Sequence, residues 1–547
     1  MRRIVSSFLL LMLIAGSAPG KENFVISPPT LLSENGINKV LCMKSGYTLL
    51  FHFEINKPLT VIVYDSLHNR VANRTVASDL LDAILLPTSS FKGLYEINGE
   101  AVLFLQQQRM GRHTLIRLRF NARSGQLTAE DRVGRSHGIA KPMRFFVLRN
   151  KVEDGYAILF AEDIPQFRKC AIQLAYYNKI HTEYKRVYLD PGRKNYDFLT
   201  VTGAEALPQG ICVSLGLSTM LVNGTGTSTE STARYNHYLH VFYIPDGSDQ
   251  PISRKADLST EILPYYTTCS YNPFAGTINV LLLSYREAFY RYGVEMRPTA
   301  FISNLLFRLD EHDLTGNYSW LRNKLANSLL LEKTDTAAMF AGLPVRIITN
   351  NNGLSTIVSE SYDRYMNAEN YTRSRAFETY LGSICITQVD DTGREIWGTV
   401  LPRSQYYRSY RHYYRPVDLA KRWQEQAMFN DLPPQITERQ FLSAAVYNRG
   451  DNYYIIYNDC GKNIRNTIAS PGDTLYASEL ANACYYRMDR KHEVTKEYLL
   501  GEPLSKEYKS CYVEGGDFDE QRGVYASLIR YKRGSYVSLR MAWVTLD

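Results

Sequence analysis

The segment with the most distinctive surface chemistry is residues 405–418, QYYRSYRHYYRPVD. Tyrosine faces stack on sugar rings and on cations, and the planar guanidinium group of arginine binds carboxylates and phosphates through two hydrogen bonds. A segment that interleaves the two residue types therefore fits recognition of an anionic glycan or a tight contact with a protein partner. The other interpretation is that the tyrosines pack between strands while the arginine head groups reach into water. The candidate binding residues are Tyr406, Tyr407, Arg408, Tyr410, Arg411, Tyr413, Tyr414 and Arg415.

Two histidines, His237 and His240, have a spacing that would place both on one face of a helix, where they could share a metal ion. Here they belong to YNHYLHVFYI, a strand-like segment in which residues three apart point to opposite faces. A zinc site would also need further histidine, cysteine or carboxylate ligands, and the sequence nominates none. We therefore expect no metal site and no other cofactor.

Other short patterns lack an essential part of the motif that they resemble. NGTGTS at residues 223–228 has no Gly-Lys-Ser/Thr ending, so a surface loop is expected in place of a phosphate-binding loop. Asp517, Asp519 and Glu520 lack the glycine and the final glutamate of a calcium loop, which favours a solvated turn. No Gly-x-Ser-x-Gly nucleophile motif is present, and we assign no catalytic residue.

The framework that must hold these segments is predicted to consist of strands. Short apolar or alternating runs separated by polar turns recur in units of strand, turn and strand. We count about seven units, at residues 40–76, 93–133, 154–189, 210–244, 277–309, 345–401 and 442–499. One small sheet cannot bury both of its faces, so such units stack on their neighbours. The prediction is an all-β, β-propeller-like array of antiparallel units, with residues 524–546 closing the ring against the first unit.

Two short helical insertions interrupt this pattern. LRNKLANSLLLEK predicts one helix near residues 320–340, and DLAKRWQEQAMF predicts another near residues 418–429. Both are expected on one rim of the array.

One unit carries a recognisable repeat motif. ICITQVDDTGREIWGTVL, residues 384–401, holds an apolar strand, the turn Thr392-Gly393, and Trp397 four residues after the glycine. This order resembles the strand, Thr-Gly turn and tryptophan of the quinoprotein-type propeller repeat. Val389 stands where that repeat usually has an aspartate, and the resemblance covers 18 residues. It supports the propeller prediction and implies no quinone cofactor.

Composition bounds the class of protein. The 547 residues include 41 tyrosines, a composition that suits half-buried pleated surfaces, and the net charge of +8 is dispersed along the chain. Dispersed charge disfavours a nucleic-acid partner. The eight cysteines are even in number but widely spaced, and one to three disulfides are plausible, with Cys460, Cys484 and Cys511 the favoured participants.

The N-terminus predicts export. Arg2 and Arg3 precede an apolar run and then small residues, the three regions of a secretory signal peptide, with cleavage expected after Gly20. The domain prediction is therefore a signal peptide at residues 1–20 and a single β-propeller-like domain at residues 21–547. The apolar run is too short to span a bilayer and no later uncharged run is long enough, so we expect a periplasmic, cell-surface or secreted protein.

Together these observations favour an exported, non-catalytic binding or scaffold protein of the cell envelope. Its partner would be a protein or an anionic glycan that contacts loops on the rim. The alternative is a carbohydrate-active hydrolase or lyase on the same fold, which would require carboxylates converging in a central funnel. Oligomeric state and substrate are left open.

Overall fold

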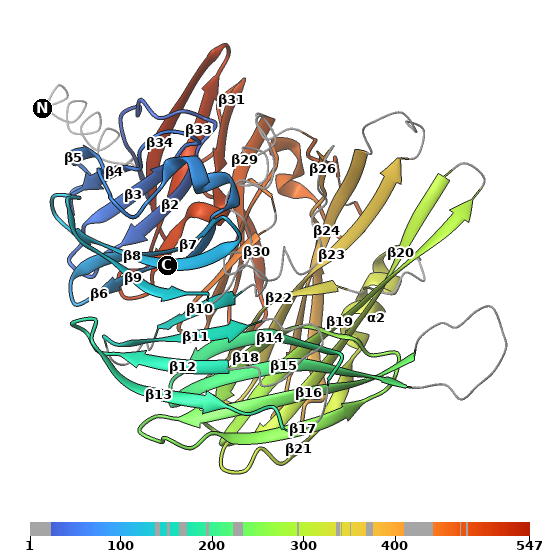
Figure 1. Ribbon diagram of the computed structural model, residues 1–547. Coiled ribbons are helices and arrows are strands. Elements are labelled where there is room, and N and C mark those ends of the chain that lie inside the picture. The colour runs from blue at the N-terminus through green and yellow to red at the C-terminus, as the bar shows by residue number, and fades with distance from the viewer. Residues whose placement is uncertain are drawn as a thin grey trace, which may run out of the picture.

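The computed structural model describes residues 23–136, 143–149, 154–162, 172–192, 196–221, 234–292, 295–334, 340, 342–350, 352–367, 376–409, 441–442, 444–470, 472–476 and 480–546. These residues form eight antiparallel sheets in a β-propeller, so each sheet is one blade (Figure 1). The predicted all-β propeller class is confirmed, with eight blades in place of about seven.

The first four blades have four strands each, numbered in chain order. Blade 1 contains β2 (Ile37–Cys42), β3 (Thr48–Phe53), β4 (Thr60–Tyr64) and β5 (Arg70–Thr75). Blade 2 contains β6 (Ser90–Ile97), β7 (Glu100–Arg109), β8 (Arg112–Asn121) and β9 (Leu127–Arg135). Blade 3 contains β10 (Met143–Arg149), β11 (Tyr156–Glu162), β12 (Ile172–Tyr177) and β13 (Glu183–Leu189). Blade 4 contains β14 (Phe198–Leu207), β15 (Gly210–Leu221), β16 (Arg234–Pro245) and β17 (Ile252–Leu258).

The other four blades continue the order, with additions in blades 6 and 8. Blade 5 contains β18 (Pro264–Asn272), β19 (Thr277–Tyr292), β20 (Glu295–Asp310) and β21 (Gly316–Leu321). Blade 6 contains β22 (Gly342–Thr349), β23 (Ser355–Asn367), β24 (Ala376–Val389) and β25 (Glu395–Leu401), with β26 (Gln405–Ser409) on β24. Blade 7 contains β27 (Ala444–Arg449), β28 (Asn452–Cys460), β29 (Ala481–Met488) and β30 (Val494–Tyr498). Blade 8 contains β31 (Glu507–Cys511), β32 (Asp517–Asp519), β33 (Val524–Arg533), β34 (Tyr536–Thr545) and β1 (Phe24–Ile26).

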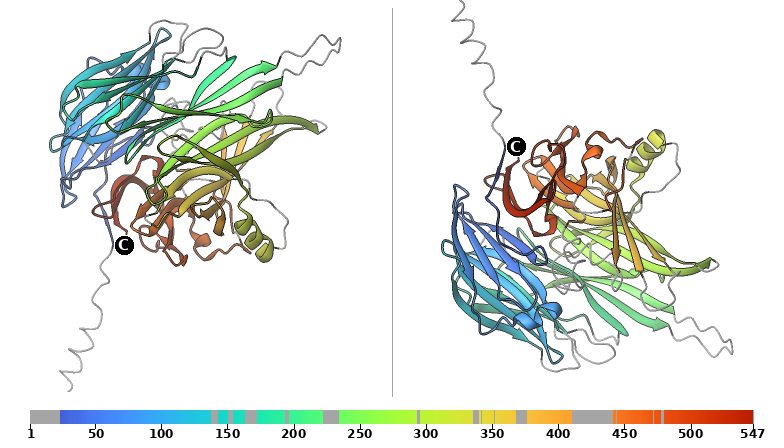
Figure 2. Two further views of the ribbon diagram at one scale, coloured as in Figure 1. Left: turned by 90° about the horizontal axis from the view of Figure 1, so that it is seen from below. Right: turned by 90° about the horizontal axis from the view of Figure 1, so that it is seen from above.

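The first strand of each blade lies innermost, next to the first strand of the neighbouring blade. Short turns join the first strand to the second and the third to the fourth, and together they form what we call the turn face. On the opposite face, called the hairpin face, the long strand pairs β15–β16, β19–β20 and β23–β24 extend beyond the ring (Figures 1 and 2). All innermost strands therefore run from the hairpin face to the turn face.

The hydrophobic core lies between blades. Phe51 of β3 and Phe120 of β8, for example, meet edge to face with ring centroids 5.2 Å apart. Such stacking buries both faces of each sheet, which an isolated four-stranded sheet could not do.

The N-terminal strand closes the ring. β1 pairs with β34 in antiparallel register, with Phe24 opposite Val544 and Ile26 opposite Ala542, so blade 8 takes its outermost strand from the other end of the chain. The sequence predicted that residues 524–546 close the ring against the first unit. In the structure the strands of this segment belong to an eighth blade instead, and the N-terminal strand β1 pairs with them.

The sequence analysis did not count the eighth blade because its innermost strand is short and interrupted. Its innermost strand is split into β31 and β32, of five and three residues, by the 3-10 turn η4 (Val513–Gly515). Neither piece has the length of the alternating runs that identify the other blades.

A repeated turn joins the third and fourth strands in blades 1, 3, 6 and 7. Its first residue is Asp65, Asn178, Asp390 or Asp489, and in each case the side-chain oxygen accepts hydrogen bonds from the amides two and four residues later. The residue three positions on has a positive φ: His68, His181, Gly393 or His492. This is an Asx turn followed by a left-handed residue.

The left-handed residue of this turn contacts the preceding blade. The His68 ring stacks on Trp543 of blade 8 at 4.4 Å, and His492 stacks on Trp397 of blade 6 at 4.3 Å. In blade 6 the position is Gly393, where a Cβ would come within 2.7 Å of Arg308 of blade 5. Thr392 and Gly393 thus belong to one of these turns, and Trp397 is the residue on which His492 of the next blade stacks. These are the three residues that resemble the quinoprotein-type repeat.

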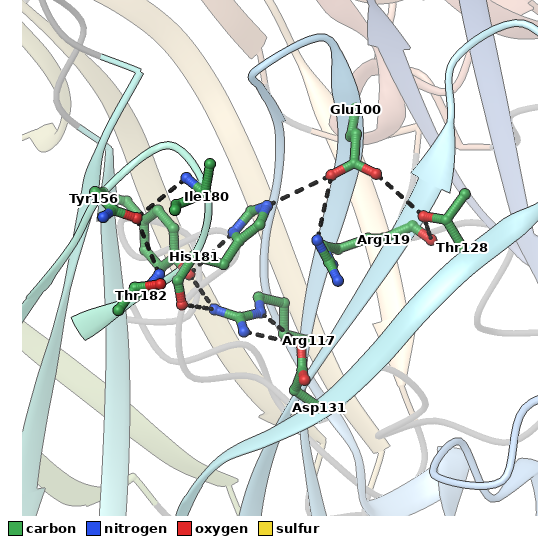
Figure 3. A network of polar contacts seen from close by, with 10 residues as sticks. Glu100, Arg117, Arg119, Thr128, Asp131, Tyr156, Ile180, His181 and Thr182 are labelled. Carbon is green, nitrogen blue, oxygen red and sulfur yellow. Dashed lines mark hydrogen bonds and ion pairs between the residues drawn. The ribbon is translucent and has the colours of Figure 1, made fainter.

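His181 makes the corresponding contact through a polar network (Figure 3). Arg117 of blade 2 donates to Asp131 at 2.8 Å, to the main-chain oxygen of His181 at 3.3 Å, and to the hydroxyl of Tyr156. His181 itself is buried in the seam between blades 2 and 3.

The helix predicted near residues 320–340 is confirmed as α2 (Lys324–Thr334), which packs on β25. The helix predicted near residues 418–429 and the signal peptide at residues 1–20 lie outside the described residues. Within the described part of the chain, no helix has the length and apolar character needed to cross a membrane.

Candidate functional site: the central cavity

Four of the innermost strands, β6, β14, β18 and β22, share an irregularity. The register shifts by one residue at Lys92 in β6, Thr202 in β14, Tyr265 in β18 and Val345 in β22. A β-bulge of this kind bends the strand and changes the direction of its side chains, and bulges are frequent beside functional sites.

The bulged strands surround a cavity of about 470 Å³ at the axis. Its wall contains residues from β2, β6, β14, β18, β22 and β27, together with η4 and Asp517. Gly203 is required in this wall, because a Cβ there would lie 2.3 Å from the main-chain oxygen of Thr267 on β18. The volume is within the range of small-ligand sites.

Basic groups converge on the cavity from three blades. Lys92 is the third residue of β6, in the half nearer the hairpin face, and is only 2 % exposed. Lys39 of β2 lies with its Nζ 4.9 Å from the ring centroid of Phe91 and 3.5 Å from the main-chain oxygen of Glu514. Arg346 of β22 donates to the main-chain oxygen of Val446.

Two carboxyl groups lie toward the turn face. Glu205 is the eighth residue of β14, and burial raises its pKa to about 7 although the Thr268 hydroxyl, the Cys269 amide and Arg346 act in the opposite direction. Burial likewise raises the pKa of Asp517 to about 6, while the amide of Cys42 donates to it at 2.7 Å. Both pKa values are therefore closer to neutral pH than those of exposed carboxyl groups. A third carboxylate, Glu514, belongs to η4.

The cavity is thus bipolar. Cationic side chains gather at mid-depth and toward the hairpin face, and titratable carboxyls lie at the other end. Such an arrangement can hold an acidic group at one end of a ligand and hydroxyl groups at the other.

The aromatic and basic segment predicted as a binding site is described in small part. Tyr406 lies in β26, half-buried, with its ring 5.0 Å from that of Tyr380 and 5.2 Å from that of Tyr476. Tyr407 and Arg408 belong to the same strand, but the structure describes only their backbone. Tyr410, Arg411, Tyr413, Tyr414 and Arg415 lie outside the described residues, so binding by this segment stays a prediction.

The two histidines with metal-like spacing both lie on β16 and have different partners. His237 shares a hydrogen bond of 2.8 Å with the hydroxyl of Ser218, and the ring of His240 lies 4.2 Å from that of Phe242. In the described ranges no three side chains of the metal-binding types form a cluster.

Seven of the eight cysteines are described, and all seven are free thiols. The sulfur atoms of Cys212 and Cys269, in blades 4 and 5, approach to 3.5 Å, too far for a covalent bond. Cys460, Cys484 and Cys511 are not bridged to one another.

Sequence reasoning missed the cavity residues. The expected solvated turn at Asp517, Asp519 and Glu520 is wrong for Asp517, because its carboxylate turns inward to the Cys42 amide. Asp519 does occupy a turn, where it accepts from the amides of Gln521 and Arg522. A signal was present elsewhere: Glu205 and Arg346 are the single charged residues of their strands, and Lys92 lies between Phe91 and Gly93 in a strand whose only other charged residue is Glu96.

No protein-family model and no curated protein sequence matches the chain. Among solved structures it is similar to the WD40 domain of SCAP from fission yeast, with 8 % identity, 96 % of this chain and 98 % of that one covered, and a TM-score of 0.32. The polysaccharide lyase Uly1 has 10 % identity, coverages of 83 % and 90 %, and a TM-score of 0.35. A post-proline cleaving enzyme from Rickettsia typhi has 9 % identity and a TM-score of 0.35, with coverages of 92 % and 58 %. Likenesses at this level assign no function.

Proposed function

We propose that this chain is an exported binding protein whose central cavity holds an acidic sugar unit of an envelope glycan. In this proposal residues 1–20 are removed as a signal peptide, and residues 21–547 form the mature propeller. The observation that carries the proposal is the convergence of Lys39, Lys92 and Arg346 from three blades on one cavity of about 470 Å³.

Burial of the two lysines supports a ligand role. Both line the cavity wall and are at most 5 % exposed, so an anionic ligand there would meet a positive charge in a poorly hydrated setting, where a charge-assisted contact is strong. A carboxylate or sulfate on a sugar ring would give these ammonium groups charge-assisted hydrogen bonds. The carboxyl groups of Glu205 and Asp517 would accept hydrogen bonds from hydroxyl groups of the same ring.

Titration calorimetry of the mature chain, Lys21 to Asp547, with glucuronate and galacturonate oligosaccharides tests the proposal. Neutral oligosaccharides of equal length serve as the ligand control. Lys39→Met and Lys92→Met each retain the aliphatic side-chain volume and remove the charge, and each is expected to weaken binding at least tenfold. Lys491→Met, at an exposed turn position, should leave affinity unchanged.

Circular dichroism and thermal unfolding establish that the lysine variants fold. If both fold and bind acidic oligosaccharides as tightly as the unaltered chain, the cavity is not the ligand site and the proposal fails.

A second candidate function, glycan cleavage, is favoured by one observation. Glu205 has its pKa raised to about 7, as a general acid needs, and Asp517 lines the same cavity. Incubation with uronate-containing polysaccharides, followed by assays for new reducing ends and for unsaturated uronate absorbance, tests this candidate. Release of either product that is abolished by Glu205→Gln would establish an enzyme, whereas binding without products retains the binding protein.

A further inference from the structure

A groove on the outer part of blade 2 gathers four arginines. The groove has a volume of about 810 Å³ and is bounded by one face of the sheet and by the segment from Ser78 to Leu85. Its wall includes Arg109, Arg112, Arg132 and Arg135, and it shares no residue with the central cavity.

Strand register places all four side chains on one face of the sheet. Arg112, Thr114 and Ile116 alternate along β8 and therefore share a face. Arg109 is directly opposite Arg112, Arg135 is opposite Thr114, and Arg132 is opposite Ile116. Residues directly opposite in a sheet point the same way, so the four arginines point into the groove.

A β-bulge is what brings Arg132 and Arg135 together. Residues three apart in a regular strand point to opposite faces. The register of β9 shifts between the partners of Leu115 and Ile116, which leaves Val133 as the extra residue. Without that extra residue one of the two arginines would point away from the groove.

The arrangement is costly for a structural surface. Arg109 and Arg112 face each other across the two-residue turn Met110-Gly111, and like charges directly opposite in a sheet destabilise it. Within the described part of the chain, none of the four guanidinium groups has an ion pair or a hydrogen bond. Glu130, on the same face, is occupied by the amides of Asp79 and Leu80 and the hydroxyl of Ser78.

The segment that forms the other wall is fixed in place. Glu130 holds its first part, and Gln107 holds its middle by accepting from the Asp82 amide at 3.1 Å and donating to the Asp82 main-chain oxygen at 3.0 Å. The groove is therefore preformed. Asp79 and Asp82 also line it, and they can accept hydrogen bonds from hydroxyl groups while they repel a continuous phosphate backbone.

We infer that this groove is a second binding site, which takes an acidic oligosaccharide bearing carboxylate or sulfate groups on neighbouring rings. The guanidinium fork matches carboxylate and sulfate oxygens in two-point fashion. A groove of this volume with two acidic residues in its wall fits a few sugar rings better than a nucleic acid. The inference does not depend on the central cavity.

The test uses the mature chain and four probes: dextran sulfate, polygalacturonate, neutral dextran and single-stranded DNA. Fluorescence anisotropy is expected to show dextran sulfate binding that weakens as salt rises and no binding of neutral dextran, whereas polygalacturonate, which the cavity also takes in the proposed function, reports on both sites together. Arg109→Gln with Arg112→Gln, and separately Arg132→Gln with Arg135→Gln, should each weaken dextran sulfate binding at least tenfold.

The matched control is Arg123→Gln with Arg490→Gln, which removes the same charge from exposed turns on the turn face. It should change affinity less than twofold. Lys39→Met with Lys92→Met should also leave dextran sulfate binding intact, which separates this groove from the cavity proposal. Equal losses in the control and groove variants would reduce the effect to net charge and overturn the inference, and so would tighter binding of DNA than of either polysaccharide.

Discussion

The imidazole Nε2 of His181 lies 3.6 Å from Oε2 of Glu100, across the seam between blades 3 and 2 (Figure 3). Glu100 also lies 3.6 Å from Arg119 and accepts from the hydroxyl of Thr128 at 3.1 Å. Despite the nearby carboxylate, burial and the charges of Arg117 and Arg119 lower the pKa of His181 to about 4. The seam is therefore built around a neutral histidine at pH 7.

Protonation of His181 should weaken the fold in acid. The unfolded chain takes up this proton near pH 6.5 and the folded chain only near pH 4, so stability is lost as the pH falls through this window. His181→Asn keeps a residue that tolerates positive φ and should reduce the acid loss in free energy of unfolding by up to about 3 kcal/mol. Urea unfolding at pH values between 7 and 4 measures this loss in the free energy of unfolding. His312→Asn, at an 84 % exposed side chain, should follow the unaltered chain, and identical pH slopes in all three would contradict the prediction.

Glu205 should act with the opposite sign. Its folded pKa of about 7 is above the ordinary value of 4.5, so the folded chain holds this proton more tightly and loses stability as pH rises from 4.5 to 7. Glu205→Gln should therefore raise the free energy of unfolding at pH 8 by up to about 3 kcal/mol and change it little at pH 4.5. Urea midpoints at the two pH values check this, with the exposed Glu261→Gln as control. If Glu205→Gln lowered the free energy of unfolding at pH 8, the folded chain would favour the charged form of Glu205, and the prediction would be wrong.

The repeated Asx turn should contribute measurably to stability. Asp489→Ala removes acceptors from the amides of Lys491 and Glu493, at 2.8 and 2.9 Å, and should cost about 1–2 kcal/mol of free energy of unfolding. Asp489→Asn should cost less than half of that, because Asn178 makes the same two bonds in blade 3. Denaturant unfolding of both variants beside the exposed Asp451→Ala tests the turn. If alanine and asparagine at position 489 lowered the free energy of unfolding equally, the side-chain hydrogen bonds of Asp489 would not be what stabilises the turn.

Among the seven described cysteines, Cys212 and Cys269 are the pair best placed to form a bridge. Their sulfur atoms are 3.5 Å apart across blades 4 and 5, and the hydrogen bond between the two thiols together with burial raises the pKa of Cys269, so the reaction should be slow. Oxidised glutathione should convert this pair of thiols to a disulfide and release two molecules of reduced glutathione. Peptide mapping by mass spectrometry detects the linked peptides, and Cys212→Ser should abolish them. A linkage between Cys484 and Cys511 in place of this pair would contradict the prediction.

Strand periodicity predicted the fold class because each blade contains at least one long run that alternates or is wholly apolar. GEAVLFLQQQ and DGYAILFAED, for example, became β7 and β11. The count of blades failed where the pattern is short: β31, β32 and β1 have three to five residues, and β1 pairs with residues at the other end of the chain. Local patterns contain no information about such distant pairing.

The sites were harder to predict, because they depend on register. Arg132 and Arg135 share a face only because Val133 is the extra residue of a β-bulge. No pattern in LTAEDRVGR predicts that bulge. Asp517 was assigned to solvent because acidic residues between glycines usually lie in exposed turns. Lys92 could have been identified, since a lysine flanked by Phe91, Gly93 and Leu94 in a strand must find a polar environment within the fold.

The pairing of β1 with β34 also has a consequence for the order of synthesis. Ser27 and Met541, which bond to each other beside this pair, are 514 positions apart in the chain. At a synthesis rate of about 5–20 residues per second, the first strand waits roughly half a minute to two minutes for its partner. Until then the ring is open and both edges of the gap are exposed. A chaperone that covers residues 24–26 during this interval would delay assembly of blade 8 alone, since the other seven blades take all their strands from consecutive stretches of chain.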